Sequence, residues 1–173
     1  MSSGSGDQLR LGFLAAVEDS ERGVVGGLLI TNRFGRPLEF QCTTPVKPNR
    51  TQQILYGPTL RPFLLAEVIG RTLVEKVSVK PHLVLVETAE LLELRPHVDV
   101  PIASLFTQAD ADEDVGFPLG KQRLMFHGDF AEDRDQIQRR SVEVPDTADL
   151  QEPFERIREA LAEALKTPMA RSA

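Results

Sequence analysis

The sequence predicts a mixed α/β (α+β) fold: a three-stranded antiparallel meander, a long helix, a buried strand and a C-terminal amphipathic helix. Three observations lead to this class. Short segments with strand-like patterns follow one another before residue 44 and are separated by turn residues. Residues 59–77 and 150–165 repeat apolar residues at helical spacing, and residues 82–87 form a nearly continuous apolar run.

Composition places the chain among globular proteins. Of its 173 residues, 41% are hydrophobic and 27% are charged, with a formal net charge of −6. These values exclude a collagen-like chain, a disulfide scaffold and a fully disordered protein. The length suits one globular domain, which we expect over residues 8–167. Residues 1–7, rich in Ser and Gly, and residues 168–173 are expected to be disordered tails.

The sequence shows neither the pattern of a membrane-spanning segment nor that of a secretory signal. The longest apolar run, residues 24–30, is much shorter than the roughly 20 residues of a membrane-spanning helix. The N-terminal residues lack the positively charged start of a secretory signal. Cys42 is the single cysteine, so an internal disulfide cannot form. We therefore expect a cytoplasmic protein without a membrane partner.

The predicted meander consists of residues 8–17, 24–31 and 38–43. Apolar and polar residues alternate at the start of the first segment and through the third, and the second is a short apolar run. Short turns rich in Asp, Asn, Gly and Arg connect them, which favours antiparallel pairing of neighbours.

The long helix is expected over residues 59–77, with Thr59 as its N-cap and Pro62 in the tolerated first turn. One side of this helix is apolar throughout. Its polar half is interrupted by Leu64, Leu65 and Val68, which predicts that the helix packs between two layers or meets a partner.

The rest of the chain predicts further elements. Residues 82–87 are typical of an interior strand. The other predicted segments are helical turns at residues 89–95, strands at residues 98–106 and 122–130, and the amphipathic helix at residues 150–165. Residues 131–149 are polar and receive no assignment.

Motifs that would name a reaction are absent from the sequence. It contains no Gly-x-Ser-x-Gly nucleophile elbow, no dinucleotide-binding glycine pattern and no phosphate-binding loop. The acidic residues 110–114 begin like a calcium loop, but Lys121 stands where the bidentate acid is needed. We therefore predict no catalytic residue, no cofactor and no metal site from motifs.

The element order resembles that of ribonuclease H-like folds, although a profilin-like or other α+β sandwich accommodates the same order. The resemblance implies two divalent ions held by acids on the first strand, the first helix and the end of the fourth strand. The matching residues here are Glu67 in the long helix and Glu87 after the apolar strand. The first strand offers acids only at its exit, at Glu18 and Asp19. A metal-dependent phosphodiesterase using Asp19, Glu67 and Glu87 is thus one alternative function.

Charge points to a second alternative. Residues 33–80 hold 8 basic residues against 3 acidic ones, whereas the chain as a whole is acidic. Arg33, Arg36, Lys47 and Arg50 lie close in sequence to Phe34 and Tyr56, and such a set is typical of nucleic-acid binding.

Because no catalytic constellation stands out, the main prediction is a non-enzymatic protein–protein interaction module. Its partner, or a second copy of the chain, would contact the helix face formed by Leu64, Leu65 and Val68.

Overall fold

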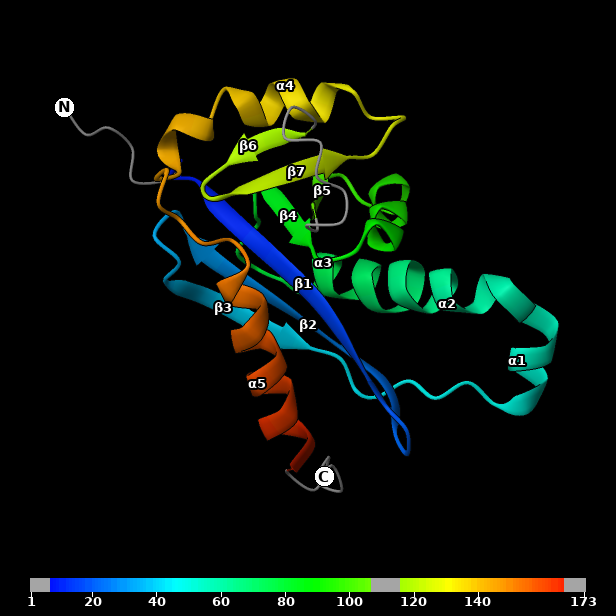
Figure 1. Cartoon of the computed structure of the whole chain (residues 1–173). Helices are drawn as coiled ribbons and strands as arrows, with labels where there is room; N and C mark the ends of the chain where they lie inside the picture. Colours follow the sequence, from blue (N-terminus) through cyan, green and yellow to red (C-terminus); the bar gives the residue numbers. More distant parts are fainter. Residues whose placement is uncertain (1–6, 107–115, 167–173) are drawn as a thin grey trace.

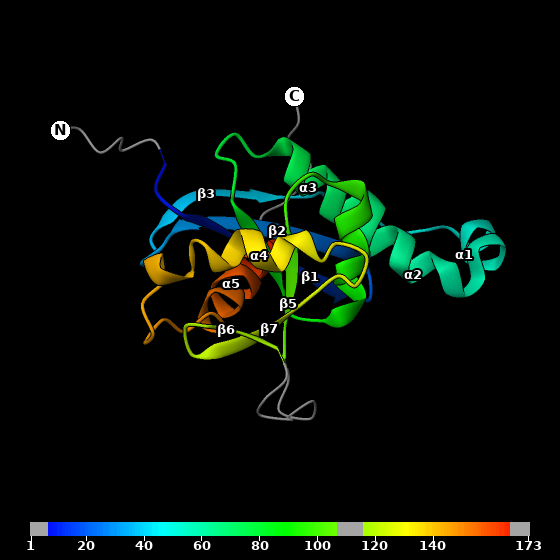
Figure 2. The ribbon, with the colours of Figure 1, turned by 90° about the horizontal axis from the view of Figure 1, so that it is seen from above.

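The computed structural model of the protein describes residues 7–106 and 116–166. These residues form three layers, with a seven-stranded mixed sheet between helices on its two faces (Figures 1 and 2). The mixed α/β fold class predicted from the sequence is confirmed. No helix among the described residues is both long and apolar enough to cross a membrane.

The strands are β1 (Arg10–Asp19), β2 (Gly23–Asn32), β3 (Pro37–Cys42), β4 (Leu83–Val86), β5 (Ile102–Leu105), β6 (Phe117–Leu119) and β7 (Gln122–Phe126). The helices are α1 (Arg50–Tyr56), α2 (Leu60–Pro62), α3 (Arg71–Lys76), α4 (Glu132–Gln138) and α5 (Glu152–Lys166). Tighter turns form η1 (Gly57–Thr59), η3 (Ala89–His97) and η5 (Ser141–Glu143), and η2 (Phe63–Gly70) is a π-helix.

The sheet has the strand order β3-β2-β1-β4-β5-β7-β6. Strands β1, β2 and β3 form the predicted antiparallel meander, in which Arg10 pairs with Asn32 and Asp19 with Gly23. Strand β4 pairs with β1 in parallel, and β5 pairs with β4 in parallel. The carboxyl ends of β1 and β4 therefore lie at the same edge of the sheet.

Alternation of side chains along β1 builds two separate hydrophobic cores. Leu11 and Phe13 face the layer of α4 and α5, and Phe13 packs edge-to-face on Phe154 with ring centres 5.5 Å apart. Leu14 faces the opposite layer, where it packs with Leu65 of η2 and its neighbours. Both faces of the sheet are covered, which explains the continuous apolar run in β4.

The helical region begins nine residues earlier than the sequence predicted, at Arg50 instead of Thr59. Asn49 accepts a hydrogen bond of 2.8 Å from the Gln52 N–H, and the Gln52 side chain accepts one of 2.9 Å from the Asn49 N–H. This reciprocal cap starts the helix, whereas the Thr59 side chain makes no capping hydrogen bond. Helix α1 consequently extends away from the sheet in both views (Figures 1 and 2).

Other segments also differ from expectation. The polar stretch left unassigned contains α4, and the short edge strand β6 was not predicted. The strand predicted at residues 98–106 is shorter in the structure, where β5 pairs with β4 on one side and β7 on the other. The expected tails at residues 1–7 and 168–173, apart from Asp7, and the acidic residues 110–114 lie outside the described residues.

Candidate functional site

The turn between β2 and β3 is organised by one side chain, that of Asn32. Its Oδ1 atom accepts hydrogen bonds from the main-chain N–H groups of Phe34, at 2.9 Å, and Arg36, at 3.0 Å. Gly35 supplies the positive φ angle of 84° that the turn needs. The loop therefore holds Arg33, Phe34 and Arg36 in a fixed arrangement at the surface.

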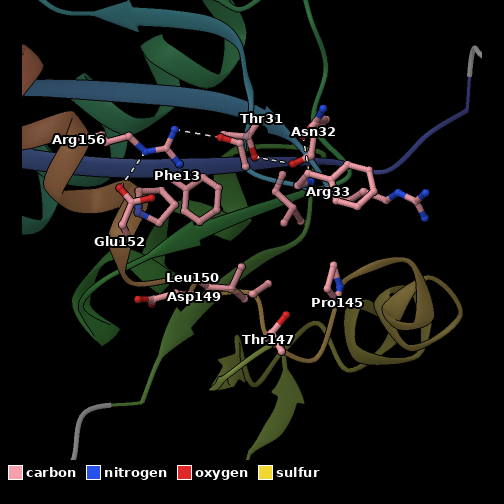
Figure 3. A pocket seen from close by; sticks show the side chains of 15 residues that line it. Phe13, Thr31, Asn32, Arg33, Pro145, Thr147, Asp149, Leu150, Glu152 and Arg156 are labelled. Carbon is pink, nitrogen blue, oxygen red and sulfur yellow. Dashed lines mark hydrogen bonds and ion pairs between the residues drawn. The ribbon is translucent and has the colours of Figure 1, made fainter.

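Helix α5 supports this turn from the side. The Arg156 guanidinium donates to the Gly35 carbonyl oxygen at 2.9 Å and to the Glu152 carboxylate at 2.9 Å. Figure 3 shows Arg156 between Glu152 and the turn. The turn is thus tied to the helix layer as well as to its own strands.

A cavity of about 540 Å³ lies between this turn and residues 145–153, and we call it the hairpin cavity. Asn32 lies opposite Pro145 and Thr147, and the Arg33 side chain points outward from the turn, away from them (Figure 3). Its inner wall is apolar and is formed by Leu11, Phe13 and Leu150, which are all buried. An apolar interior with a few polar groups at the rim is the usual composition of a small-molecule or nucleotide site.

Two groups at the rim of the cavity could contact a ligand. The Phe34 side chain is 66% exposed, and the Arg33 guanidinium carbon lies 4.6 Å from the centre of its ring. On the other side, the Asp149 carboxylate accepts hydrogen bonds of 3.0 Å from the Gln151 N–H and the Gln122 side chain. The Gln151 N–H is the main cause that keeps the pKa of Asp149 below its ordinary value, so this group stays ionised near neutral pH.

The four basic residues predicted to bind nucleic acid do not form one surface. Arg33 and Arg36 lie beyond the carboxyl end of β2, whereas Lys47 and Arg50 lie near its amino end, where Val46 pairs with Val24. Ten strand residues separate the two ends, which is about 30 Å. Tyr56 belongs to the second group and stacks on Phe63 instead of standing free.

The edge where β1 and β4 both end holds a second cavity of about 360 Å³, which we call the carboxyl-end crevice. Its lining includes three acidic residues, Glu18, Glu87 and Glu90, together with Arg61. The Arg61 guanidinium donates to Glu18 and makes contacts of 3.0 and 3.1 Å to the two oxygens of Glu90. These hydrogen bonds, to Glu90 first and to Glu18 second, raise the pKa of Arg61 above its ordinary value.

The three acids suggested by the ribonuclease H-like resemblance do not converge. Asp19 accepts hydrogen bonds from the N–H groups of Glu21 and Arg22 in the β1–β2 turn. Glu67 lies 3.8 Å from His97 in another cavity, and Glu87 pairs with Arg158 of α5. Across residues 7–106 and 116–166, no group of three acids, histidines or cysteines is placed to hold one metal ion.

No protein-family model matches this sequence, and no curated protein matches it. Solved structures do resemble it, at low identity. Human ENDOV has a TM-score of 0.46 and 10% identity, over 93% of this chain and 87% of its own. An endonuclease V from Ciona intestinalis, solved with a 23mer DNA, has a TM-score of 0.35 and 9% identity, over 58% and 46%. Argonaute from Marinitoga piezophila, solved with a guide RNA, has a TM-score of 0.31 and 14% identity, over 58% and 16%.

The predicted protein–protein interaction module is wrong. The similar solved structures named above include two endonucleases V and an Argonaute, two of the three with bound nucleic acid. The contact face that the prediction requires is not free: Leu64 and Leu65 are only 8% and 5% exposed, and Val68 is half-buried. Leu65 belongs to the core under the sheet, and Leu64 lines a small cavity with Val24 and Pro48. The extra apolar residues reflect burial of this helix on more than one side.

Two residues of the hairpin cavity were not found from the sequence. Asn32 followed by Gly35 is a turn signal, and an Asx turn could have been read from it. Arg156 follows Glu152 at a spacing of four, which indicates an ordinary surface ion pair on a helix. No local sequence pattern predicts the contact of Arg156 with the turn.

Proposed function

We propose that this protein binds single-stranded nucleic acid at the hairpin cavity, with one base stacked on Phe34 and neighbouring phosphates on Arg33 and Arg36. The observation that carries this proposal is the exposed Phe34 ring with the Arg33 guanidinium 4.6 Å from its centre, at the rim of a 540 Å³ cavity. Proteins that bind single strands combine exposed aromatic rings with basic groups along the backbone path.

The distribution of charge supports a defined orientation of the ligand. Arg33 and Arg36 are exposed on the outer side of the turn, whereas the ionised Asp149 and the Glu152 carboxylate line the cavity. Carboxylates repel phosphate but accept hydrogen bonds from the N–H groups of a base edge. The base therefore enters the cavity and the phosphates remain outside with the arginines.

The rigidity of the turn supports binding as well. Its conformation is fixed by the two hydrogen bonds to Asn32 Oδ1 and by the contact from Arg156. A loop that is already ordered loses little conformational freedom when the ligand binds. Single strands are preferred over duplexes because only an unstacked base can reach both the Phe34 ring and the cavity.

The test is fluorescence anisotropy of the full chain with labelled single-stranded DNA, single-stranded RNA and duplex DNA, at several salt concentrations. Phe34→Ala removes the stacking ring and is expected to weaken single-strand binding about 5- to 150-fold, which corresponds to roughly 1–3 kcal/mol. Arg33→Ala with Arg36→Ala is expected to weaken binding and to reduce the salt slope by about 1.4, since each phosphate contact contributes roughly 0.7.

The chain offers a matched control. Lys47→Ala with Arg50→Ala changes the net charge by the same amount at the other end of β2, and we expect unchanged affinity. Equal losses in the two double variants would mean that only overall charge matters, which contradicts the proposal. Failure of the wild-type protein to bind any single strand also contradicts it.

A cytoplasmic location is part of the same proposal and rests on the sequence.

A further inference from the structure

The carboxyl-end crevice contains a cation that belongs to the chain itself. Arg61 projects from α2 between β1 and η3. Its guanidinium contacts Glu18 on β1 and Glu90 on η3. The Nε and Nη2 atoms of Arg61 donate to the two Glu90 oxygens at 3.1 and 3.0 Å, while Nη1 donates to Glu18. Such a fork matches carboxylate geometry closely and is stronger than a contact between single atoms.

We infer that Arg61 takes the place of a divalent cation in this crevice, so that the chain does not carry out metal-dependent phosphodiester cleavage there. The inference goes beyond the proposed function and holds whether or not nucleic acid binds at the hairpin cavity. The resemblance to ribonuclease H-like folds implies metal ions at this edge of the sheet, and the side chains present there do not fit them.

The misfit begins in β1. Leu14, Ala15 and Ala16 of this strand line the crevice, and none of these side chains carries an oxygen that could bind a metal ion. Glu18 is the nearest acid on the same strand, and it is already bound to Arg61. A divalent ion at this position would therefore have to displace a guanidinium that is held by two carboxylates.

The third carboxylate is also engaged. Glu87, directly after β4, pairs with Arg158 and accepts a hydrogen bond of 3.1 Å from the Gln151 side chain. All three acids of the crevice thus pair with arginine, and the guanidinium groups of Arg61 and Arg158 balance two of the three negative charges. A guanidinium stays protonated at every pH at which proteins fold, so Arg61 keeps its positive charge.

The helical framework fixes Arg61 in place. The residues that follow it in η2 include Leu64 and Leu65, which are buried, so the backbone at the base of the Arg61 side chain cannot move freely. Glu90 lies in the first turn of η3, whose Leu91 and Leu92 are buried in the same core. The ion pairs therefore join two elements that are both anchored in the core.

The test is calorimetric titration of the full chain with Mn²⁺, read together with the Mn²⁺-dependent shift of the melting temperature. We expect no Mn²⁺ binding at the crevice of the wild-type protein. Arg61→Met keeps most of the apolar stem and frees Glu18 and Glu90. It should bind Mn²⁺ at least about tenfold more tightly than any residual binding of the wild-type protein, since such ions need only one or two carboxylates plus water. Arg71→Met is the matched control, because it breaks the exposed Arg71–Glu75 pair with the same charge change.

Two further measurements make the result decisive. The triple variant Arg61→Met, Glu18→Gln, Glu90→Gln should lose the gained Mn²⁺ binding. The inference is overturned if wild-type Mn²⁺ binding exists and is lost in Glu18→Gln or Glu90→Gln, or if Arg61→Met binds Mn²⁺ no better than Arg71→Met. The wild-type titration and an oligonucleotide cleavage assay remain decisive even if Arg61→Met does not fold, because metal-dependent cleavage that Glu87→Gln abolishes would also overturn the inference.

Discussion

The Arg156 guanidinium donates a hydrogen bond of 2.9 Å to the main-chain carbonyl of Gly35, a residue 121 positions earlier in the chain. This contact joins α5 to the β2–β3 turn and closes one end of the hairpin cavity. Because the acceptor is a main-chain atom, the contact controls the position of the whole turn, including the two side chains before Gly35.

The first prediction follows from this contact. Arg156→Ala should loosen the turn, speed amide hydrogen exchange at residues 33–36 and weaken single-strand binding several-fold, because a mobile loop must be ordered on binding. Arg158→Ala is the control, since Arg158 lies on the same helix but pairs with Glu87. Equal exchange rates in the wild-type protein and Arg156→Ala would mean that the contact does not position the turn.

Asn32 provides a second prediction. Asn32→Ala removes the acceptor of two main-chain N–H groups and should cost about 1–2 kcal/mol of unfolding free energy. For a chain of this length that corresponds to a melting temperature lower by about 2–8 °C. Asn32→Asp keeps the acceptor and should retain most of the stability. A melting curve of Asn32→Ala that overlays the wild-type curve would contradict this role.

The buried ion pair between η3 and α4 gives a third prediction. Asp133 is buried and accepts hydrogen bonds of 2.6 and 3.1 Å from the mostly buried Arg95 guanidinium. Asp133→Ala leaves that cation without its partner and should cost about 3–5 kcal/mol in urea unfolding. Replacing both residues, as Arg95→Met with Asp133→Ala, should cost less than Asp133→Ala alone. A larger loss in the double variant would mean that the pair contributes mainly through packing.

A fourth prediction concerns pH. Burial, followed by the charges of Arg140 and Arg10, lowers the pKa of His82 below its ordinary value, although Asp7 opposes the shift. The neutral ring accepts a hydrogen bond of 3.0 Å from the Arg10 N–H, which protonation would remove. The unfolded chain therefore binds this proton more readily, and stability should fall as the pH drops from about 7 through the lowered pKa. His82→Asn keeps an acceptor without titrating, so its urea midpoint should change less over this range; an equal pH dependence would exclude His82 as the cause.

Close packing at Gly26 gives a fifth prediction. A Cβ atom at this position would lie 2.1 Å from Ile69 Cγ2 and 3.2 Å from Leu73 Cδ1. Gly26→Ala should therefore push η2 away from β2 and cost about 1–3 kcal/mol. Combining it with Ile69→Ala should give a smaller loss than the two single losses added together, because the clash is relieved. Strict additivity would show that the two residues do not meet.

Patterns with a strong local cause were predictable from the sequence. Alternation at Leu11, Phe13 and their neighbours predicted β1, and the apolar run in β4 predicted an interior strand. The start of the first helix was missed because Thr59 is a suitable N-cap residue, whereas the reciprocal cap of Asn49 and Gln52 starts the helix nine residues earlier. Local pattern thus identified the strands better than the helix boundary.

The site depended on contacts between distant segments. Arg33 and Arg50 belong to the same basic region of the sequence, but the length of β2 separates them in the fold. Arg61 and Glu90 are 29 residues apart, and no periodicity links them. The spacing of Leu64 and Leu65 showed that both sides of the helix are apolar, but only the fold shows that the chain itself covers them.

The most direct test of the proposed function is photo-crosslinking of the full wild-type chain to a single-stranded oligonucleotide that carries one photoreactive base, followed by peptide mapping. We expect cross-links within residues 31–36 and 145–156, the two segments that border the hairpin cavity, and we expect them to be lost in Phe34→Ala and in the presence of excess unlabelled strand. Cross-links at residues 47–56 or at the carboxyl-end crevice, or the absence of any cross-link that unlabelled strand removes, would contradict it.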